Sequence, residues 1–183
     1  AAAADGVSTL KVDLADRSDL DRPQVGGGIV DKALDDWNGL AFVSDPFAAP
    51  IEVSGLFSAK LDLTTNKKDF DFAVSLYELT AAGDHIELSH WIGRASHVGD
   101  LSRRRLLTPG RRTRLDLTSG RLTSRQFQPG SRLIVQVSVI KQPQLQINYG
   151  TGKDVSDETI ADAGAPLEIQ LFGNSWVEVP TAP

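Results

Sequence analysis

The sequence predicts an all-β protein, an antiparallel β-sandwich or jelly roll with one or two short helices. The first observation is an alternation of apolar and polar residues from Pro50 to Leu63, the period of a strand with one buried face. The second is that about ten short stretches of strand character follow one another. The third is the turn signals between them, such as Pro109-Gly110 and Pro129-Gly130. In the first stretch, the apolar parity contains Ile51, Val53, Phe57, Ala59, Leu61 and Leu63.

A chain of 183 residues fits one structural domain. We expect residues 1–38 to form an irregular segment packed on the sandwich, and residues 39–183 to form the sandwich itself. Val7–Leu14 alternates weakly and predicts an edge strand, whereas Asp16–Gly28 predicts a loop. Ile29–Trp37 predicts a short helix that ends near Asn38-Gly39.

The strands predicted after residue 38 are Leu40–Val43, Ile51–Leu63, Phe70–Leu79, His85–Ile92, Arg103–Leu107, Arg112–Leu117, Arg121–Phe127, Arg132–Ile140, Leu167–Phe172 and Trp176–Val179. The polar segment Tyr149–Pro166 interrupts this series. There we expect a helix of one or two turns over Asp157–Ala163, with Ser156 as the N-cap and Gly164 as the stop.

Composition excludes several kinds of chemistry. Cysteine is absent, which excludes disulfides, thiolate zinc sites and a cysteine nucleophile. No apolar run reaches the ~18 residues of a membrane span, so we expect no membrane partner. Methionine is also absent, even at the first position, and we expect the sequence to be part of a longer chain. The compartment, exported or cytoplasmic, stays open.

The charge is distributed unevenly. The chain carries a net charge of −5, yet the segment from Arg94 to Arg132 holds ten arginines, no lysine and two acids. Arginine forms planar, bidentate contacts with carboxylates, so the block indicates either a solvated face or a docking face for an acidic partner. Only one aromatic residue, Phe127, lies among these arginines, and the overall charge is negative, so we expect no nucleic-acid partner.

Motifs of catalysis are incomplete. Gly173-Asn174-Ser175-Trp176-Val177 lacks the second glycine of a serine hydrolase elbow. Ser96 and His97 are sequence neighbours, a spacing that does not suit a nucleophile and its base. Gly150-Thr151-Gly152-Lys153 lacks the first glycine of a phosphate-binding loop and predicts a turn. We therefore expect this chain alone not to be an enzyme, and we predict no catalytic residue.

Binding sites are weakly indicated. His90 shares the parity of Leu88 and Ile92, which predicts that it faces inward, and no second histidine stands at ligand spacing, so we expect no metal and no cofactor. Whether the acidic segment 154–162 binds Ca²⁺ is left open. A groove of exposed aromatic residues would instead indicate a free-standing carbohydrate-binding module. Its candidates are Trp37, Trp91 and Trp176.

Ordered motifs along the chain suggest relatives. They are Asn38–Phe47 (NGLAFVSDPF), Pro50–Gly55 (PIEVSG), Thr65–Phe72 (TNKKDFDF), Val74–Leu79 (VSLYEL), Leu107–Gly110 (LTPG), Phe127–Leu133 (FQPGSRL) and Ile147–Gly152 (INYGTG). Together they resemble the C-terminal jelly-roll domain of the X-Pro dipeptidyl-peptidase family, which includes the cocaine esterases and the α-amino acid ester hydrolases. The resemblance extends from about Leu10 to Pro180. One turn departs from it: Ala82-Gly83-Asp84 stands where some relatives have Pro-Asp-Gly.

The resemblance implies a galactose-binding-like β-sandwich without any residue of the catalytic triad. In such enzymes an α/β-hydrolase domain carries the Ser–Asp–His triad, and the sandwich packs on it, helps to wall the substrate cleft and often contributes to oligomer contacts. The expected partners are thus the hydrolase domain of the same chain and further copies in a homo-oligomer. The docking residues we predict are Arg103, Arg104, Arg105, Arg111, Arg112, Arg114 and, as an aromatic anchor, Trp91.

Overall fold

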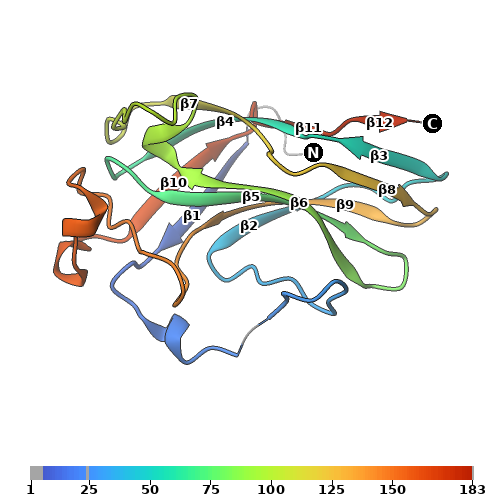
Figure 1. Cartoon of the computed structure of the whole chain (residues 1–183), viewed down its shortest axis with the longest axis horizontal. Helices are drawn as coiled ribbons and strands as arrows, with labels where there is room; N and C mark the ends of the chain where they lie inside the picture. The colour runs from blue at the N-terminus through green and yellow to red at the C-terminus, as the bar shows by residue number, and fades with distance from the viewer. Residues whose placement is uncertain (1–5, 24, 183) are drawn as a thin grey trace.

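The computed structural model describes residues 6–23 and 25–182 and confirms the all-β, antiparallel sandwich (Figure 1). A first sheet has the order β1 (Val7–Val12), β10 (Leu167–Phe172), β4 (Ser58–Thr65) and β11 (Trp176–Glu178), with β7 (Thr113–Thr118) also paired to β4. A second has the order β12 (Thr181–Ala182), β3 (Ile51–Gly55) and β8 (Thr123–Phe127). A third has the order β2 (Gly39–Val43), β9 (Arg132–Val139), β5 (Asp71–Leu79) and β6 (His85–Arg94).

The core lies between the first and third sheets. Phe57, Phe70, Phe72 and Phe127 are almost fully buried in it. Leucines of β4 and β10 contribute from one layer, and valines of β5 and β9 from the other. The inward parity predicted for residues 51–63 is confirmed, because Val53, Phe57, Ala59, Leu61 and Leu63 are all buried and Ile51 packs against them.

The stretch predicted as one strand over Ile51–Leu63 is two strands, β3 and β4, in different sheets. Gly55 ends β3 with a φ of +133°, a conformation that residues with a Cβ rarely adopt. Phe57 then donates its backbone N–H to the Ser119 hydroxyl at 3.1 Å. The chain therefore changes sheets without losing its two-residue alternation, and the sequence pattern alone does not reveal the break.

A bulge in β6 corrects the prediction that His90 faces inward. Tyr77 of β5 pairs with Glu87 while Leu76 pairs with Ser89, so Leu88 is an extra residue. An extra residue inverts the faces of all that follow. His90 consequently lies on the outer face with its side chain 38% exposed, 2.6 Å from Glu87, whereas Trp91 turns toward the core.

Three predicted elements are wrong. Ile29–Trp37 contains no helix: Asp31 exchanges two backbone hydrogen bonds with His85, which holds this segment extended beside β6. Arg103–Leu107 is not a strand, because the N–H groups of Arg105 and Leu107 donate to the separate carbonyls of Ser96 and Lys68.

In place of the helix over Asp157–Ala163, the chain forms two 3₁₀ turns, η3 (Val155–Asp157) and η4 (Ile160–Asp162). The N-cap of η3 is Asp154, not Ser156. The other short turns are η1 (Ser18–Leu20) and η2 (Ala95–His97). Among the residues placed, no helix is long and apolar enough to cross a membrane.

Candidate docking surface

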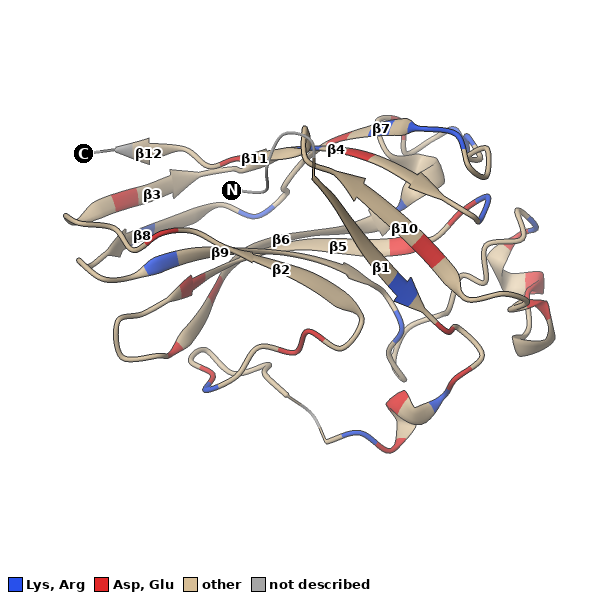
Figure 2. Ribbon diagram, turned by 180° about the vertical axis from the view of Figure 1, so that it is seen from behind, with Lys and Arg blue, Asp and Glu red and all other residues tan. Residues whose placement is uncertain are grey.

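Most of the predicted docking residues lie in one loop, residues 98–112, which joins η2 to β7 and which we call the arginine loop. Figure 2 shows the basic segment at the β7 end of the sandwich, the same end as the acidic segment with η3 and η4. The loop is thus held beside residues 148–166 although it is far from them in sequence.

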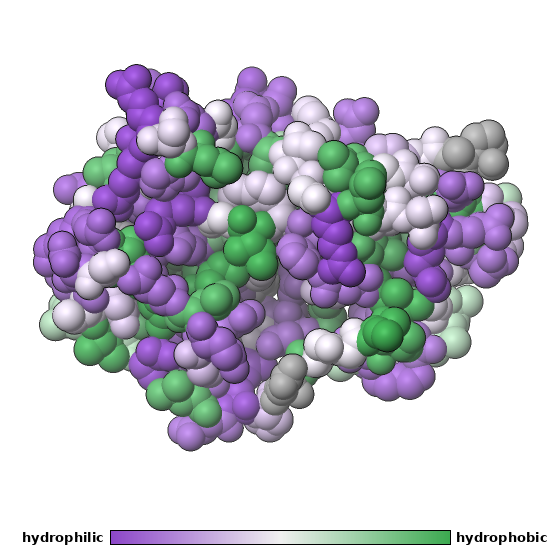
Figure 3. Space-filling model, viewed as in Figure 1, coloured by the Kyte–Doolittle hydropathy of each residue, from purple (hydrophilic) through white to green (hydrophobic). Residues whose placement is uncertain are grey.

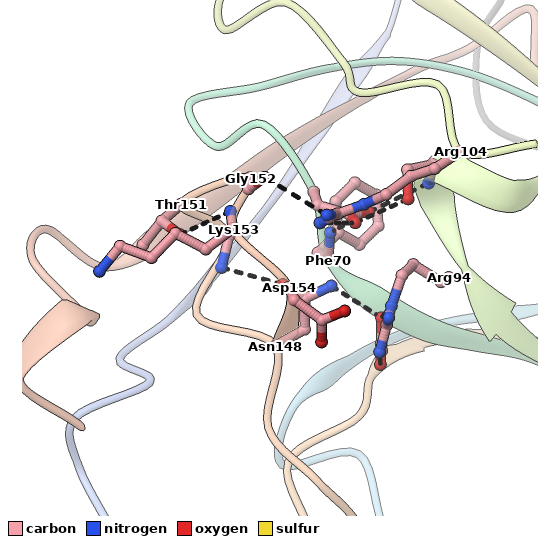
Figure 4. A network of polar contacts seen from close by, with 12 residues as sticks. Phe70, Arg94, Arg104, Asn148, Thr151, Gly152, Lys153 and Asp154 are labelled. Carbon is pink, nitrogen blue, oxygen red and sulfur yellow. Dashed lines mark hydrogen bonds and ion pairs between the residues drawn. The ribbon is translucent and has the colours of Figure 1, made fainter. Parts of the chain in front are cut away.

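Arg104 points into the protein. Its Nη2 contacts Asp69 Oδ2 at 3.1 Å, and its Nη1 donates to the Gly152 carbonyl at 3.3 Å (Figure 4). Asp69 is fully buried and also accepts hydrogen bonds from the Ser96 hydroxyl at 2.7 Å and from the backbone N–H groups of Phe70 and Ser96. A buried carboxylate needs such partners. Arg104 therefore fastens the arginine loop to the body of the domain.

Arg112 has a similar internal role. It donates two hydrogen bonds to the Asp62 carboxylate at 2.8 and 3.0 Å, and its guanidinium lies 4.0 Å from the centre of the Phe172 ring. These bonds from Arg112, aided by the Asn174 amide, lower the pKa of Asp62 below its ordinary value. Arg112 thereby joins the start of β7 to β4 and β10.

The remaining predicted arginines of this region point outward. Within residues 6–23 and 25–182, the side chains of Arg103, Arg105, Arg111 and Arg114 are exposed and form no direct hydrogen bond or ion pair, while Asp100 and Asp62 attract Arg105 and Arg114 electrostatically. The arginine block is therefore of two kinds, with Arg104 and Arg112 committed to internal carboxylates and these four available for a partner. The sequence does not distinguish the two kinds, because the acids that pair with Arg104 and Arg112 lie 35 and 50 residues away.

Trp91 packs on Phe72 with the ring centres 4.8 Å apart and borders a hollow of about 480 Å³. Trp176 lies in the same hollow with 43% of its surface exposed, and the Lys60 ammonium lies 5.2 Å from the centre of its ring. Trp37 borders a different hollow, where Arg22 and Lys141 approach its ring. The three tryptophans therefore do not share one groove.

A second hollow, of about 450 Å³, lies next to the first. Three apolar side chains with large exposed fractions border it: Ile92 at 55%, Leu101 at 86% and Leu145 at 44%. Leu101 and His97 also border the tryptophan hollow, so the two hollows are adjacent. In the space-filling view, hydrophobic residues gather near the middle of one face among polar ones (Figure 3). We name Ile92, Leu101 and Leu145 the Leu101 ridge.

Sequence reasoning missed the Leu101 ridge. Ile92 has the parity of buried residues and is turned outward only by the bulge at Leu88. Leu101 stands alone in a polar loop, where an isolated apolar residue gives no periodic signal. The one available sign is that Leu101 stands two positions before the densest cluster of arginines.

The motifs set aside in the sequence have internal roles. The loop at residues 149–151 donates the N–H groups of Tyr149 and Thr151 to the Glu158 carboxylate at 2.7 and 2.8 Å, so these N–H groups already have an internal acceptor. Ser96 donates to Asp69, and the Ser175 hydroxyl accepts the N–H of Asp62.

The acidic segment is also paired internally. Asp162 contacts Lys153 at 2.6 Å and accepts the N–H of Thr159, and these bonds lower the pKa of Asp162. Asp154 accepts the N–H of Ser156 at 2.9 Å. In the part of the chain that is described, no three His, Asp or Glu side chains gather as a metal site would require. The carboxylates of Asp154, Glu158 and Asp162 thus accept separate hydrogen bonds.

Comparison with known proteins shows a family match and a related enzyme. The model of the family described as the X-Pro dipeptidyl-peptidase C-terminal non-catalytic domain matches residues 1–166. The cocaine esterase of Rhodococcus sp. (strain MB1 Bresler) is 29% identical over 125 residues, which are 67% of this chain and 21% of the esterase.

Solved structures share the fold. An aminopeptidase from a marine sediment Thaumarchaeota archaeon superposes with a TM-score of 0.83 at 19% identity, covering 100% of this chain and 34% of that one. An α-amino acid ester hydrolase superposes with a TM-score of 0.72 at 21% identity, covering 79% of this chain and 26% of that one. The chain therefore spans about a fifth to a third of the length of these relatives.

Proposed function

Since the chain belongs to the family of X-Pro dipeptidyl-peptidase C-terminal non-catalytic domains, we propose that it packs on the α/β-hydrolase domain of a longer serine hydrolase and helps to wall its substrate cleft. The parent enzyme cleaves amide or ester bonds by acyl transfer through a serine nucleophile that lies outside this chain. The role of the sandwich is to bind and shape, and the chemistry belongs to its partner.

One observation carries the proposal: a complete sandwich with its own core corresponds to only about a third of hydrolases that are much longer. The hydrogen bonds that its polar residues form within the domain agree with this proposal. A serine nucleophile needs a base within hydrogen-bond reach, whereas the Ser96 hydroxyl donates to a buried carboxylate that Arg104 already neutralises. Such a network holds a loop in place and commits the hydroxyl to an ion-paired carboxylate.

The experiment separates the parent enzyme into two parts. We expect the parent without these 183 residues to lose activity and thermal stability, and the separately produced chain to restore both when added in trans. Restoration would require physical association, which co-elution on a sizing column measures. A truncated parent that keeps full activity and stability would contradict the proposal.

A second candidate function, a carbohydrate-binding module, is favoured by the shared hollow of Trp91 and Trp176. Aromatic side chains with one wet face are suited to sugar rings. A glycan array probed with the chain tests it, with Trp176→Ala as the matched variant. Specific binding that this substitution abolishes would support the module, and an array without binders would remove it.

A further inference from the structure

The Leu101 ridge is an unusual surface for a domain that exists alone. Leu101 exposes 86% of its surface, and Ile92 and Leu145 border the same hollow. Single exposed apolar residues are ordinary, but a contiguous group beside a hollow marks an interaction surface. The adjoining hollow with Trp91 and Trp176 extends this surface to the edge of the first sheet.

The loop that carries Leu101 is fixed by several bonds. On one side of it, Asp100 accepts hydrogen bonds from the N–H and hydroxyl of Ser102 at 3.0 and 2.7 Å. On the other side, Arg104 contacts Asp69 and Arg105 donates its N–H to the Ser96 carbonyl at 2.7 Å. A side chain held outward by such bonds loses little conformational entropy when a partner covers it. The loop geometry therefore keeps the Leu101 side chain available to a partner and away from the surface of its own domain.

The charge beside the ridge indicates the chemistry of the occupant. Arg103 and Arg105 lie two and four positions after Leu101 in the same loop, are exposed, and form no direct hydrogen bond or ion pair through their side chains within the described residues, while Asp100 attracts Arg105 electrostatically. An apolar centre with exposed guanidinium groups in the same loop complements an apolar patch bordered by carboxylates. A second copy docked through the same face would bring two sets of these arginines into one interface, because a two-fold interface uses one patch twice.

We propose that the Leu101 ridge is the surface by which this domain contacts the rest of its parent chain, and that the contacting surface is apolar with acidic residues at its rim. This inference rests on the proposed function. The relatives are about three to five times as long as the part of them that matches this chain, so the parent supplies an ample surface. The ridge would then position the sandwich, with Arg103 and Arg105 setting its orientation.

The test uses the full-length parent enzyme with Leu101→Asp, and with Leu122→Asp as the matched control. Leu122 is also a strongly exposed leucine, at 73%, and borders neither hollow of the ridge. We expect Leu101→Asp to lower the melting temperature of the parent by about 3 °C or more and its activity about tenfold, while Leu122→Asp resembles the unaltered enzyme. A double variant, Arg103→Glu with Arg105→Glu, should weaken docking further as salt is lowered. It leaves Arg104 and its bond to Asp69 intact.

The outcomes separate this inference from the proposed function. If Leu101→Asp and Leu122→Asp behave alike in a parent that still requires the domain, the ridge is not the contact surface, although the accessory role stands. If the truncated parent is fully active, the accessory role itself fails. If Leu101→Asp changes only the oligomeric state measured by light scattering, a second copy occupies the ridge and the inference is overturned.

Discussion

Arg104 and Asp69 form an ion pair in which the arginine Nη2 lies 3.1 Å from a carboxylate oxygen of a fully buried residue. The pair divides a run of three arginines by function, since Arg103 and Arg105 on either side of Arg104 point to solvent. The same residue type thus anchors a loop at one position and presents charge at the next. A charge-reversal test that includes Arg104 would therefore confuse folding with docking.

The first prediction follows from that pair. Arg104→Ala should lower the free energy of unfolding by about 2 kcal/mol, because the buried Asp69 loses a charged partner. Arg103→Ala should change it by less than about 0.5 kcal/mol, since its side chain is exposed and forms no hydrogen bond or ion pair with the described residues. Urea unfolding followed by tryptophan fluorescence measures both. Equal effects would mean that the bond between Arg104 and Asp69 contributes nothing to stability.

The second prediction concerns the close approach of two loops. Gly150 has a φ of +79°, and a Cβ built on it would lie 2.7 Å from the Asp69 carbonyl oxygen. Gly110 has a similar φ of +75° but no atom within 4 Å of such a Cβ. Gly110→Ala should therefore cost only the backbone strain, about 1 kcal/mol, and Gly150→Ala about 2 kcal/mol more. Thermal unfolding of the two variants measures these losses of stability. Equal losses for Gly110→Ala and Gly150→Ala would contradict tight packing at Gly150.

The third prediction is a dependence of stability on pH. Arg112 lowers the pKa of Asp62 in the folded protein, so the ion pair stabilises the fold fully above the ordinary carboxyl pKa of 3.8. Its contribution disappears as the pH falls through the lowered pKa of the folded state. Asp62→Asn should be less stable than the unaltered protein at pH 6, and the difference should shrink below about pH 4. Urea midpoints measured from pH 6 to pH 2 test this, and a constant difference would contradict it.

The fourth prediction separates the two tryptophans of one hollow. Trp91 packs on Phe72 and the core, so Trp91→Ala should cost about 2 kcal/mol or more. Trp176 is 43% exposed on a short strand, so Trp176→Ala should cost about 1 kcal/mol or less. Denaturant unfolding followed by circular dichroism avoids dependence on the removed fluorophore. A larger loss at Trp176 would show that the hollow is packed differently.

The strands could be predicted from the sequence because burial on one face imposes a two-residue period. That period places Phe72 and Val74 of β5 in the core correctly. It fails where a local event shifts the count, as at Leu88, whose insertion turns His90 and Ile92 outward. No local signal marks that bulge, because it depends on pairing with β5.

The candidate surface was less accessible to sequence reasoning. The arginine block is visible in the sequence and its use for docking stays a prediction, but the partners of Arg104 and Arg112 are brought to that loop only by folding. Leu101 and Leu145 lie 44 positions apart in sequence and border one hollow because two loops meet at the same end of the sandwich. Such a surface results from the topology and cannot be read from local sequence. The family resemblance, in contrast, depends on ordered local motifs, and the match of the family model to residues 1–166 confirms that resemblance.

The most direct test of the account is an assay of the purified chain on an amino-acyl ester and an X-Pro anilide, beside the full-length parent. The account predicts that the chain alone turns over neither substrate and that the parent hydrolyses at least one of them. Turnover by the isolated chain that persists through contaminant controls would contradict the central claim, because it would require a catalytic site within these 183 residues.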